Sequence, residues 1–286
     1  MNIMELMIRK QFLPQTLGDR FAFLFFILIL PLGYWFTLFI VIPTVVPNSP
    51  VRYLLHFIWS TFLMISIVSN FVYLVLTDCN ASNAIKQASN QTHWKYCAVC
   101  DCETPPRSWH CDICKICILK RDHHCRFSGC CIGHQNQRFF IMFLAYLSIG
   151  TLYSTCYILI FLWTSTSFTI SVFSVAKMIF PMAVFVLGID TSSSQLYSIM
   201  LIVNFLGLVL SSCLLIYHFS VMLKGAVMYE NSHKIYEYDL GSWKENLKQV
   251  FGSRWYISWI SPFIKSELPN NGADWESVKC QAVKCK

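Results

Sequence analysis

The residue types that could do chemistry in this sequence are concentrated in one stretch. Nine of the 14 cysteines lie between Cys97 and Cys131. The stretch contains two C-x-x-C pairs, and this spacing lets the two thiolates of a pair converge on one metal ion. The pairs are Cys97 with Cys100 and Cys111 with Cys114, and they are accompanied by His110, Cys117, His124 and Cys131. Structural zinc takes four nitrogen or sulfur ligands in a closed tetrahedron, so the stretch can supply two zinc sites with residues to spare.

Three residues of the same stretch are not needed as zinc ligands and suggest a nucleophile. Asp122, His123 and Cys125 belong to the run Asp-His-His-Cys. A cysteine attacks as the thiolate, which a neighbouring imidazole and the positive field of zinc both favour. A carboxylate can hold that imidazole in the useful tautomer. On spacing alone, the alternative stays open that Cys125 is one more metal ligand or an inert thiol.

The remainder of the chain must hold this stretch at a membrane. Hydrophobic residues make up 55% of the 286 residues and charged residues 13%, whereas a soluble chain carries about 25% charged residues. The shortage comes from four apolar stretches, at about 21–46, 53–76, 139–163 and 196–222. Each exceeds the roughly 20 residues that a helix needs to cross the hydrocarbon core, and each must be helical because lipid cannot satisfy free backbone amides. The sequence therefore predicts an all-α membrane protein with four transmembrane helices.

The distribution of basic residues predicts which side of the membrane each segment faces. Twenty of the 22 lysines and arginines lie in residues 1–20, 77–138 and 223–286, and the positive-inside rule places all three segments in the cytosol. An even number of crossings must then follow the long loop, which favours four spans over five or six. A fifth apolar stretch, 168–188, carries Lys177, and we expect it to stay on the lumenal side or to re-enter the membrane.

These boundaries predict the domain organisation. It comprises a cytosolic N-terminus at 1–20, spans 1 and 2 at 21–76, a Cys-rich domain with two zinc sites at 77–138, spans 3 and 4 at 139–222 with a lumenal or re-entrant segment at 164–195, and a cytosolic tail at 223–286. Cytosolic thiols stay reduced, which favours metal binding over the alternative of a lumenal disulfide knot. About 60 residues with few large apolar side chains bury little core, so zinc is expected to stabilise the domain, by roughly 10 kcal/mol or more per ion.

With these elements placed, the sequence resembles the DHHC cysteine-rich family of protein S-acyltransferases. The family pattern is C-x2-C followed by P-x-R-x2-HC-x2-C-x2-C-x4-DHHC-x5-C-[IV]-G-x2-N-x3-F, in a loop between the second and third spans. Its positions are matched by Cys97, Cys100, Pro105 or Pro106, Arg107, His110, Cys111, Cys114, Cys117, the Asp122–Cys125 run, Cys131, Gly133, Asn136 and Phe140. The motif is very specific, and together with the order of the spans the resemblance covers nearly the whole chain.

The resemblance implies a role for each matched residue. One zinc would be held by Cys97, Cys100, His110 and Cys117, and the second by Cys111, Cys114, His124 and Cys131. Cys125 would be the nucleophile, His123 its base and Asp122 the residue that orients His123. In a ping-pong reaction, palmitoyl-CoA or a similar acyl-CoA would load Cys125, and cysteines of membrane-associated proteins would accept the chain. The expected location is the lipid bilayer of the Golgi or endoplasmic reticulum, and the basic tail is expected to meet anionic lipid rather than nucleic acid.

The sequence also departs from the family pattern. Arg-Phe-Ser at 126–128 stands where most members have Pro-Trp-Val, and Cys130 stands where an asparagine is usual. The Thr-Thr-x-Glu motif after the last span corresponds to residues 227–230 and keeps only Glu230. Arg126 could favour the thiolate, contact CoA phosphates or face anionic headgroups. A catalytically weak, zinc-bearing membrane scaffold of the same fold is the alternative function, whereas the few ionisable residues in the spans argue against a transporter or channel.

Overall fold

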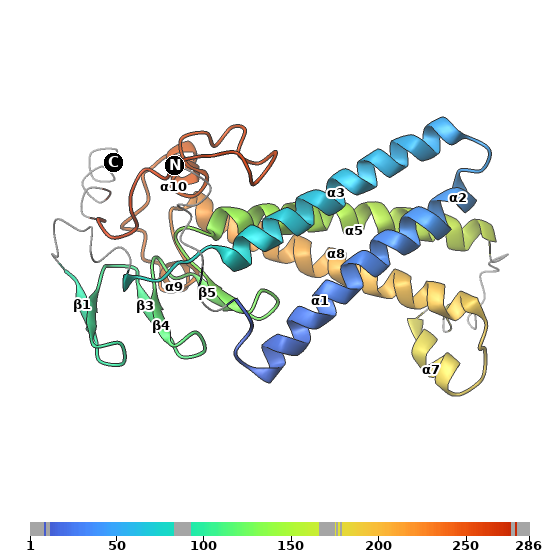
Figure 1. The fold of residues 1–286 in the computed structure, drawn as a ribbon, viewed down its shortest axis with the longest axis horizontal. Helices are drawn as coiled ribbons and strands as arrows, with labels where there is room; N and C mark the ends of the chain where they lie inside the picture. Colours follow the sequence, from blue (N-terminus) through green and yellow to red (C-terminus); the bar gives the residue numbers. More distant parts are fainter. Residues whose placement is uncertain are drawn as a thin grey trace. The chain divides into compact units, whose positions relative to one another are not determined.

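Within the part of the chain that the structure describes, four helices are long and apolar enough to cross a membrane. A computed structural model describes residues 9, 12–82, 93–165, 175, 177, 179–275 and 278. Within these residues the spans are α1 (Leu17–Phe36), continued by the π-helical turn η2 (Thr37–Val41) and α2 (Ile42–Val45), then α3 (Pro50–Leu76), α5 (Gln137–Ser165) and α8 (Ser193–Leu223) (Figure 1). The predicted fold class, a helical membrane protein with four candidate spans and a Cys-rich domain between the second and third, is confirmed.

The ends of these helices follow from local sequence. The hydroxyl of Thr16 accepts a hydrogen bond from the backbone N–H of Asp19 at 3.1 Å, which caps the N-terminus of α1. Pro50 is the first residue of α3, where its fixed φ suits a helix and its missing N–H costs no hydrogen bond. Beyond Leu223, the last residue of α8, Gly225 adopts a left-handed φ of 65°, which ends a helix without a steric penalty.

The fifth apolar stretch, 168–188, lies partly outside the described residues. Its described part includes the short helix α7 (Pro181–Val186). The ammonium group of Lys177 donates a hydrogen bond to the Asp190 carboxylate at 2.7 Å, so this basic residue is paired. The location of the stretch relative to the membrane stays a prediction.

The chain divides into two compact units, which are described separately. Unit 1 comprises Met1–Phe26, Val68–Phe143 and Leu215–Lys286, and unit 2 comprises Ile27–Ile67 and Leu144–Leu214. Unit 1 contains the Cys-rich domain and the short helices α9 (Met228–Ser232) and α10 (Trp243–Phe251). All residues proposed from the sequence for catalysis and metal binding therefore belong to unit 1.

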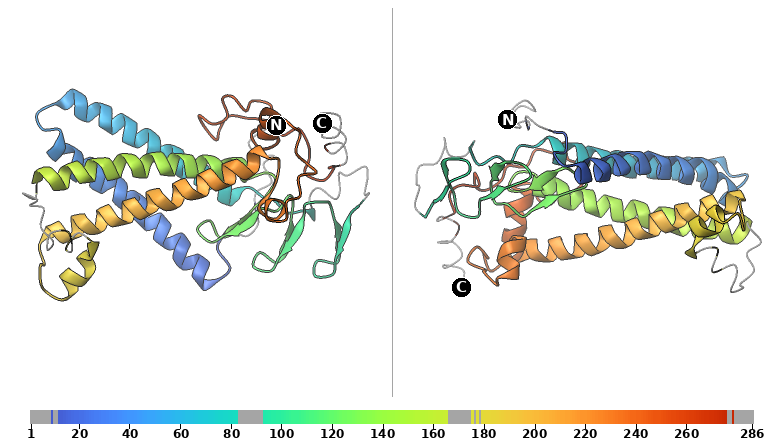
Figure 2. Two further views of the ribbon diagram at one scale, coloured as in Figure 1. Left: turned by 180° about the vertical axis from the view of Figure 1, so that it is seen from behind. Right: turned by 90° about the horizontal axis from the view of Figure 1, so that it is seen from below.

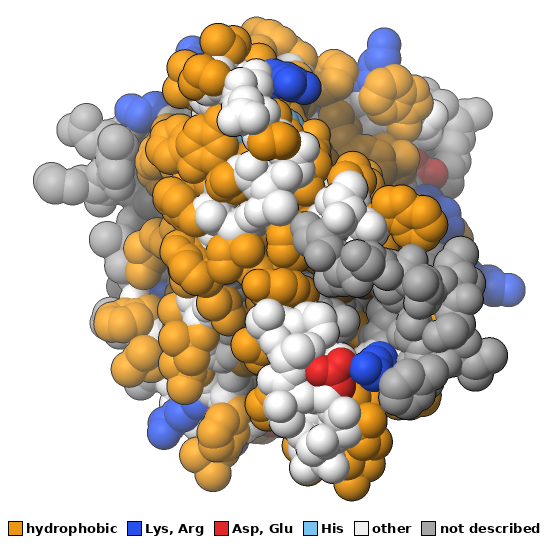
Figure 3. All heavy atoms as spheres, turned by 90° about the vertical axis from the view of Figure 1, so that its right-hand side faces the viewer, with side chains coloured by type: hydrophobic (Ala, Val, Ile, Leu, Met, Phe, Trp, Pro, Cys, Tyr) orange, Lys and Arg blue, Asp and Glu red, His pale blue; other side chains and the backbone are white. Residues whose placement is uncertain are grey.

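Unit 2 is built from helical segments with an apolar core. The buried cluster consists of Phe36, Val41, Ile158, Phe161, Leu162 and Leu201. Hydroxyl groups also pair elsewhere in unit 2, Thr37 with Ser154 at 2.6 Å and Ser148 with Ser211 at 3.0 Å, which satisfies polar atoms in apolar surroundings. Hydrophobic side chains also make up much of the described surface on the face seen in Figure 3, together with uncharged polar groups and backbone.

The Cys-rich domain of unit 1 is a row of three antiparallel β-hairpins in chain order (Figures 1 and 2). The first hairpin pairs β1 (Lys95–Cys97) with β2 (Cys102–Thr104), the second pairs β3 (Trp109–Cys111) with β4 (Ile116–Ile118), and the third pairs β5 (His123–Cys125) with β6 (Cys130–Ile132). The sequence did not predict these strands. Each has only three residues, too few for an alternating hydrophobic pattern to be recognised.

Candidate active site

The second hairpin supplies ligands to two metal-binding clusters. His110 and Cys111 are neighbours in β3, and successive side chains of a strand point to opposite faces. The first cluster contains Cys97, Cys100, His110 and Cys117, and the second contains Cys111, Cys114, His124 and Cys131. In each cluster the four candidate ligand atoms lie within 4.8 Å of one another. The structure thus brings together the same two sets of four that the resemblance implied.

The interatomic distances of the second cluster fit zinc. With bonds of about 2.3 Å to sulfur and about 2.0 Å to nitrogen, a regular tetrahedron has edges of about 3.8 Å between sulfurs and about 3.5 Å between sulfur and nitrogen. His124 Nδ1 lies 3.7 Å from Cys111 Sγ and 3.4 Å from Cys114 Sγ. It lies 3.7 Å from Cys131 Sγ, and the Sγ atoms of Cys114 and Cys131 are 3.8 Å apart. Both clusters can hold zinc, and in the first the Cys100 Sγ to His110 Nδ1 distance is 3.2 Å.

The third hairpin repeats the backbone of the other two. Cys97, Cys111 and Cys125 are the last residues of β1, β3 and β5, and each is followed by a four-residue turn. Each turn ends on a residue with a left-handed φ, which is Asp101 (49°), Lys115 (57°) or Gly129 (61°). Cys125 therefore occupies the position of the first cysteine of a C-x-x-C pair. Ser128 takes the position of the second cysteine, which is Cys100 in the first hairpin and Cys114 in the second.

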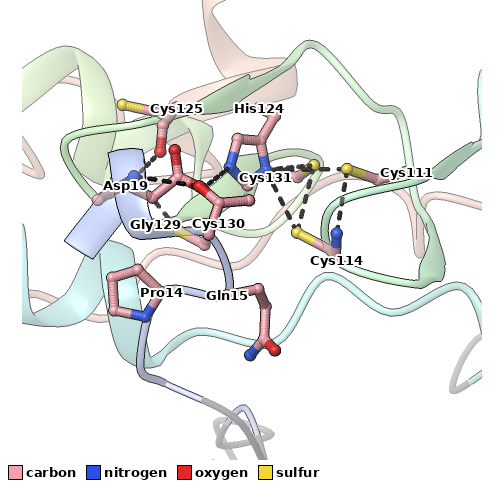
Figure 4. Close-up of polar contacts among 12 residues, drawn as sticks. Pro14, Gln15, Asp19, Cys111, Cys114, His124, Cys125, Gly129, Cys130 and Cys131 are labelled. Atoms are coloured by element: carbon pink, nitrogen blue, oxygen red, sulfur yellow. Dashed lines mark hydrogen bonds and ion pairs between the residues drawn. The ribbon is translucent and has the colours of Figure 1, made fainter. Parts of the chain in front are cut away.

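Strand alternation separates Cys125 from the second cluster. His124 faces that cluster, so His123 and Cys125, one residue to either side of it in β5, point to the opposite face. In Figure 4 the sulfur of Cys125 points away from the sulfurs of the cluster. The run of four residues thus divides into one metal ligand and a separate group of Asp122, His123 and Cys125.

The carboxylate of Asp122 anchors this group. Its Oδ2 accepts a hydrogen bond from His123 Nδ1 at 2.8 Å and lies 3.2 Å from Nδ1 of His218. Its Oδ1 accepts a hydrogen bond from the backbone N–H of Met228, the first residue of α9, at 2.8 Å. The rings of His123 and His218 stack with centroids 4.8 Å apart. Asp122 is buried, and these contacts fix both the carboxylate and the imidazole of His123.

The electrostatics of the group favour a thiolate on Cys125. Burial would raise the pKa of Cys125, but hydrogen bonds from His123 and Ser128 hold this pKa below its usual value. Burial would lower the pKa of His123, but hydrogen bonds to Asp122 and Cys125 raise this pKa to about 9. Burial also opposes ionisation of Asp122, yet hydrogen bonds from His123 and His218 keep the pKa of the carboxyl low. The arrangement therefore supports an imidazolium–thiolate pair with an ionised carboxylate behind it.

Comparison with known proteins decides the family. The sequence profile of the DHHC palmitoyltransferase family matches residues 90–235, just over half of the chain. A probable palmitoyltransferase, ZDHHC24 of Mus musculus, is 28% identical over 236 residues, 81% of either chain. The palmitoyltransferase ZDHHC22 of Danio rerio is 29% identical over 222 residues, which cover 73% of this chain and 80% of the relative. The probable protein S-acyltransferase 12 of Arabidopsis thaliana is 31% identical over 182 residues, 61% of this chain and 56% of the relative.

The chain belongs to the DHHC palmitoyltransferase family. It is accordingly a multi-pass membrane acyltransferase, as the resemblance predicted. The Asp-His-His-Cys run of the family motif stands in the third hairpin, and its last residue, Cys125, has the lowered pKa described above.

One departure from the family pattern lies directly beside Cys125. In this DHHC palmitoyltransferase Ser128 replaces the usual valine, and its side chain is buried. The hydroxyl oxygen of Ser128 lies 3.3 Å from the backbone oxygen of Cys125, and hydrogen bonds from the hydroxyl and the backbone N–H of Ser128 lower the pKa of the thiol. Arg126 is exposed in the same turn.

A second departure is the loss of both threonines from the Thr-Thr-x-Glu motif. The contact at this position that reaches Asp122 comes from the backbone N–H of Met228, which does not depend on the side chain. The retained Glu230 accepts two hydrogen bonds from Arg107, at 2.7 Å and 2.6 Å. Both side chains are buried, and the Arg107 guanidinium lies 4.4 Å from the ring of Trp275. This bidentate pair holds α9 where its first N–H can reach Asp122.

Three contacts of the site were missed from the sequence. They are His218 on Asp122, the Met228 amide on the same carboxylate, and Asp19, whose Oδ2 lies 3.2 Å from His124 Nε2. An ionisable residue near the end of an apolar span is a functional candidate, and this signal could have pointed to His218. Nothing local distinguishes Met228 or Asp19, because their partners are more than a hundred residues away.

Proposed function

We propose that this palmitoyltransferase transfers a long-chain acyl group from acyl-CoA to cysteines of membrane-associated proteins through a thioester on Cys125. The observation that carries this proposal is the division of the third hairpin into two faces. One face presents His124 to a metal cluster, and the other presents Cys125 together with His123 and its carboxylate partner Asp122. A nucleophile, a base and an orienting carboxylate are thereby assembled at a position that the metal ligands hold rigid.

The chemistry assigns one task to each residue. His123 holds the proton taken from the Cys125 thiol, and the thiolate attacks the thioester carbonyl of the acyl-CoA. The carbon–sulfur bond to CoA breaks, and the departing CoA thiolate takes the proton from His123. In the second half-reaction, His123 removes the proton from a substrate thiol, whose sulfur attacks the acyl–Cys125 thioester. Cys125 leaves as the thiolate, while Asp122 holds the imidazole in position throughout.

The two clusters are proposed to hold structural zinc. Three sulfurs and one imidazole nitrogen in each cluster match the donor set of closed zinc sites, which stabilise small domains with little core of their own. Bound zinc would supply folding stability and a positive field near Cys125. The residues of the two clusters would hold the three hairpins in place. Through His124 they would also hold β5, the strand that carries the proposed nucleophile.

We also propose a role for Arg126, the side of the membrane that the domain faces, and the organelle. Arg126 is exposed in the turn after Cys125, where its guanidinium could contact the phosphates of CoA. The Cys-rich domain and both termini are proposed to face the cytosol, where acyl-CoA is available. A Golgi or endoplasmic reticulum location rests on the family resemblance alone. Ser128 and Met228 weigh against the alternative of a weakly active scaffold. Both positions depart from the family pattern, yet Ser128 contacts Cys125 and the Met228 amide contacts Asp122.

The test is autoacylation of the detergent-purified protein with an alkyne-tagged palmitoyl-CoA, with Cys125→Ser as the comparison. We expect a label on the wild type that neutral hydroxylamine removes, and no label on Cys125→Ser. Absence of label on both proteins, with two zinc ions per chain, would favour the scaffold. Equal labelling of both proteins would contradict the assignment of Cys125.

A further inference from the structure

We infer that Asp19, at the start of the first span, fixes the tautomer and orientation of His124 and thereby strengthens metal binding in the second cluster. This inference rests on the zinc site proposed above. Asp19 lies in α1, in a part of the chain that the family motif does not include. Its role would tie the first transmembrane helix to the hairpin that carries the nucleophile.

The two ring nitrogens of His124 face different partners. Nδ1 points to the three sulfurs of the second cluster, at 3.4–3.7 Å, and Nε2 lies 3.2 Å from Oδ2 of Asp19 (Figure 4). A neutral imidazole that gives the lone pair of one nitrogen to a metal carries its proton on the other nitrogen. Nε2–H therefore donates to Asp19. A carboxylate in this place fixes the ring of a ligating histidine and increases its basicity.

Burial makes this contact strong. The side chains of Asp19 and His124 are 2% and 7% exposed, so water neither screens the hydrogen bond nor competes for its donor. A buried N–H without an acceptor would carry a desolvation penalty, so removal of the carboxylate would destabilise the arrangement in which His124 is a ligand.

The segment that carries Asp19 is itself docked on the third hairpin. The N–H of Asp19 is held by the Thr16 hydroxyl at 3.1 Å, and Arg9 donates a hydrogen bond to the backbone oxygen of Gly129 at 3.1 Å. Pro14 packs so closely on Gly129 that a Cβ there would lie 2.5 Å from Pro14 Cγ. Gly129 also has a left-handed φ of 61°, so this close approach requires glycine. The carboxylate thus reaches His124 from a segment fixed at several points.

The first cluster provides a matched contrast. Asp112 Oδ1 lies 3.7 Å from Nε2 of His110, the histidine of that cluster, but the Asp112 side chain is 94% exposed. This distance is too long for a hydrogen bond, and an exposed charge pair contributes little. The same two residue types therefore approach each other at both clusters, and only the pair at His124 is buried and hydrogen-bonded.

The experiment measures zinc rather than catalysis. Full-length wild type, Asp19→Leu, Asp19→Asn and Asp112→Asn are purified in detergent, and zinc release to a chromophoric chelator is followed over time. Cysteines exposed by the release are then alkylated and identified by mass spectrometry. We expect one of the two zinc ions to be released from Asp19→Leu at a rate about 10–100 times that of the wild type. The newly alkylated cysteines should be Cys111, Cys114 and Cys131. Asp112→Asn should match the wild type.

Asp19→Asn keeps an oxygen acceptor without the charge, so we expect a smaller acceleration of about threefold at the same three cysteines. If Asp19→Leu does not fold, Asp19→Asn decides the question. Release at the wild-type rate from the Asp19 variants would overturn the inference, as would faster release from the first cluster alone. Because the readout is zinc, failure of the proposed acyl transfer would show separately, as an unlabelled wild type that holds two zinc ions.

Discussion

The first two hairpins and the third share a backbone but differ in what their end-of-strand cysteine does. Cys97 and Cys111 each belong to a cluster of four metal-binding side chains. Cys125 occupies the same place in the third hairpin, where Ser128 replaces the second cysteine and His123 lies on the same face. In the second hairpin the backbone N–H of Cys114 in the turn donates to the Cys111 sulfur at 3.4 Å, and in the third hairpin the backbone N–H of Ser128 helps to lower the pKa of Cys125. We therefore propose that a backbone suited to stabilising thiolates for metal binding stabilises, in the third hairpin, the thiolate of a catalytic cysteine.

The largest expected effect separates the two kinds of cysteine. Cys125→Ser should abolish autoacylation and leave zinc at two ions per chain, because Cys125 is in neither cluster. Cys111→Ser should lose the metal of the second cluster and destabilise the fold. Autoacylation together with zinc analysis by mass spectrometry measures both effects. Loss of zinc from Cys125→Ser would show that the third hairpin also binds metal.

Removal of the charge behind His123 should have the next largest effect. Asp122→Asn weakens the hydrogen bond to His123 Nδ1, so the imidazolium that supports the thiolate is no longer favoured. We expect the autoacylation rate to fall by about 100-fold or more, with zinc content unchanged. Asp112→Asn, in the turn of the second hairpin, is the exposed control. A rate close to that of the wild type would contradict the orienting role of Asp122.

His218 tests whether the carboxylate needs its second partner. His218→Phe keeps an aromatic ring against His123 but removes the nitrogen 3.2 Å from Asp122. Loss of one hydrogen bond to a charged group predicts a decrease of about tenfold in autoacylation rate. His218→Gln retains a donor and should recover part of the rate. A wild-type rate for His218→Phe together with a slower His218→Gln would indicate that ring packing alone matters here.

The smallest effect should come from substitutions of Ser128, the residue at which the third hairpin differs from the C-x-x-C pairs of the other two. Ser128→Ala removes the hydroxyl and should slow alkylation of Cys125 by about threefold. Ser128→Cys restores a C-x-x-C pair, so we expect autoacylation that added zinc inhibits and a chelator recovers. The Ser128→Ala protein is the control for zinc sensitivity. Zinc-insensitive Ser128→Cys would mean that the third hairpin cannot present two sulfurs to one ion.

The features that the sequence predicted correctly depend on local patterns. Four apolar stretches are long enough to span, and among the described residues each of them coincides closely with a helix that is long and apolar enough to cross a membrane. The resemblance to the family, which rests on the cysteine and histidine motif, implied the same two sets of four residues that the structure brings together. In both cases a short segment carries the information, either as continuous hydrophobicity or as a motif that matches a known family.

The contacts missed from the sequence depend on chain segments that meet only after folding. Asp19 and His124 are 105 residues apart in sequence, and Met228 acts through its backbone, which leaves no trace in residue type. The hairpins were missed because three-residue strands filled with ligands show no hydrophobic alternation. The recurrence of Cys97, Cys111 and Cys125 every 14 residues was nevertheless visible, and it reflects the shared backbone of the three hairpins.

The most direct test of the central claim is the alkylation rate of each cysteine in the zinc-loaded protein near pH 7, resolved by mass spectrometry. We expect Cys125 to react fastest and palmitoyl-CoA to block that reaction. Cys97 and Cys111 should react only after a chelator is added. Cys130, whose pKa burial raises to about 12, should stay slow and serves as an internal control. If Cys125 were instead protected until the chelator removed zinc, it would be a metal ligand, and the proposed division of labour among the three hairpins would be wrong.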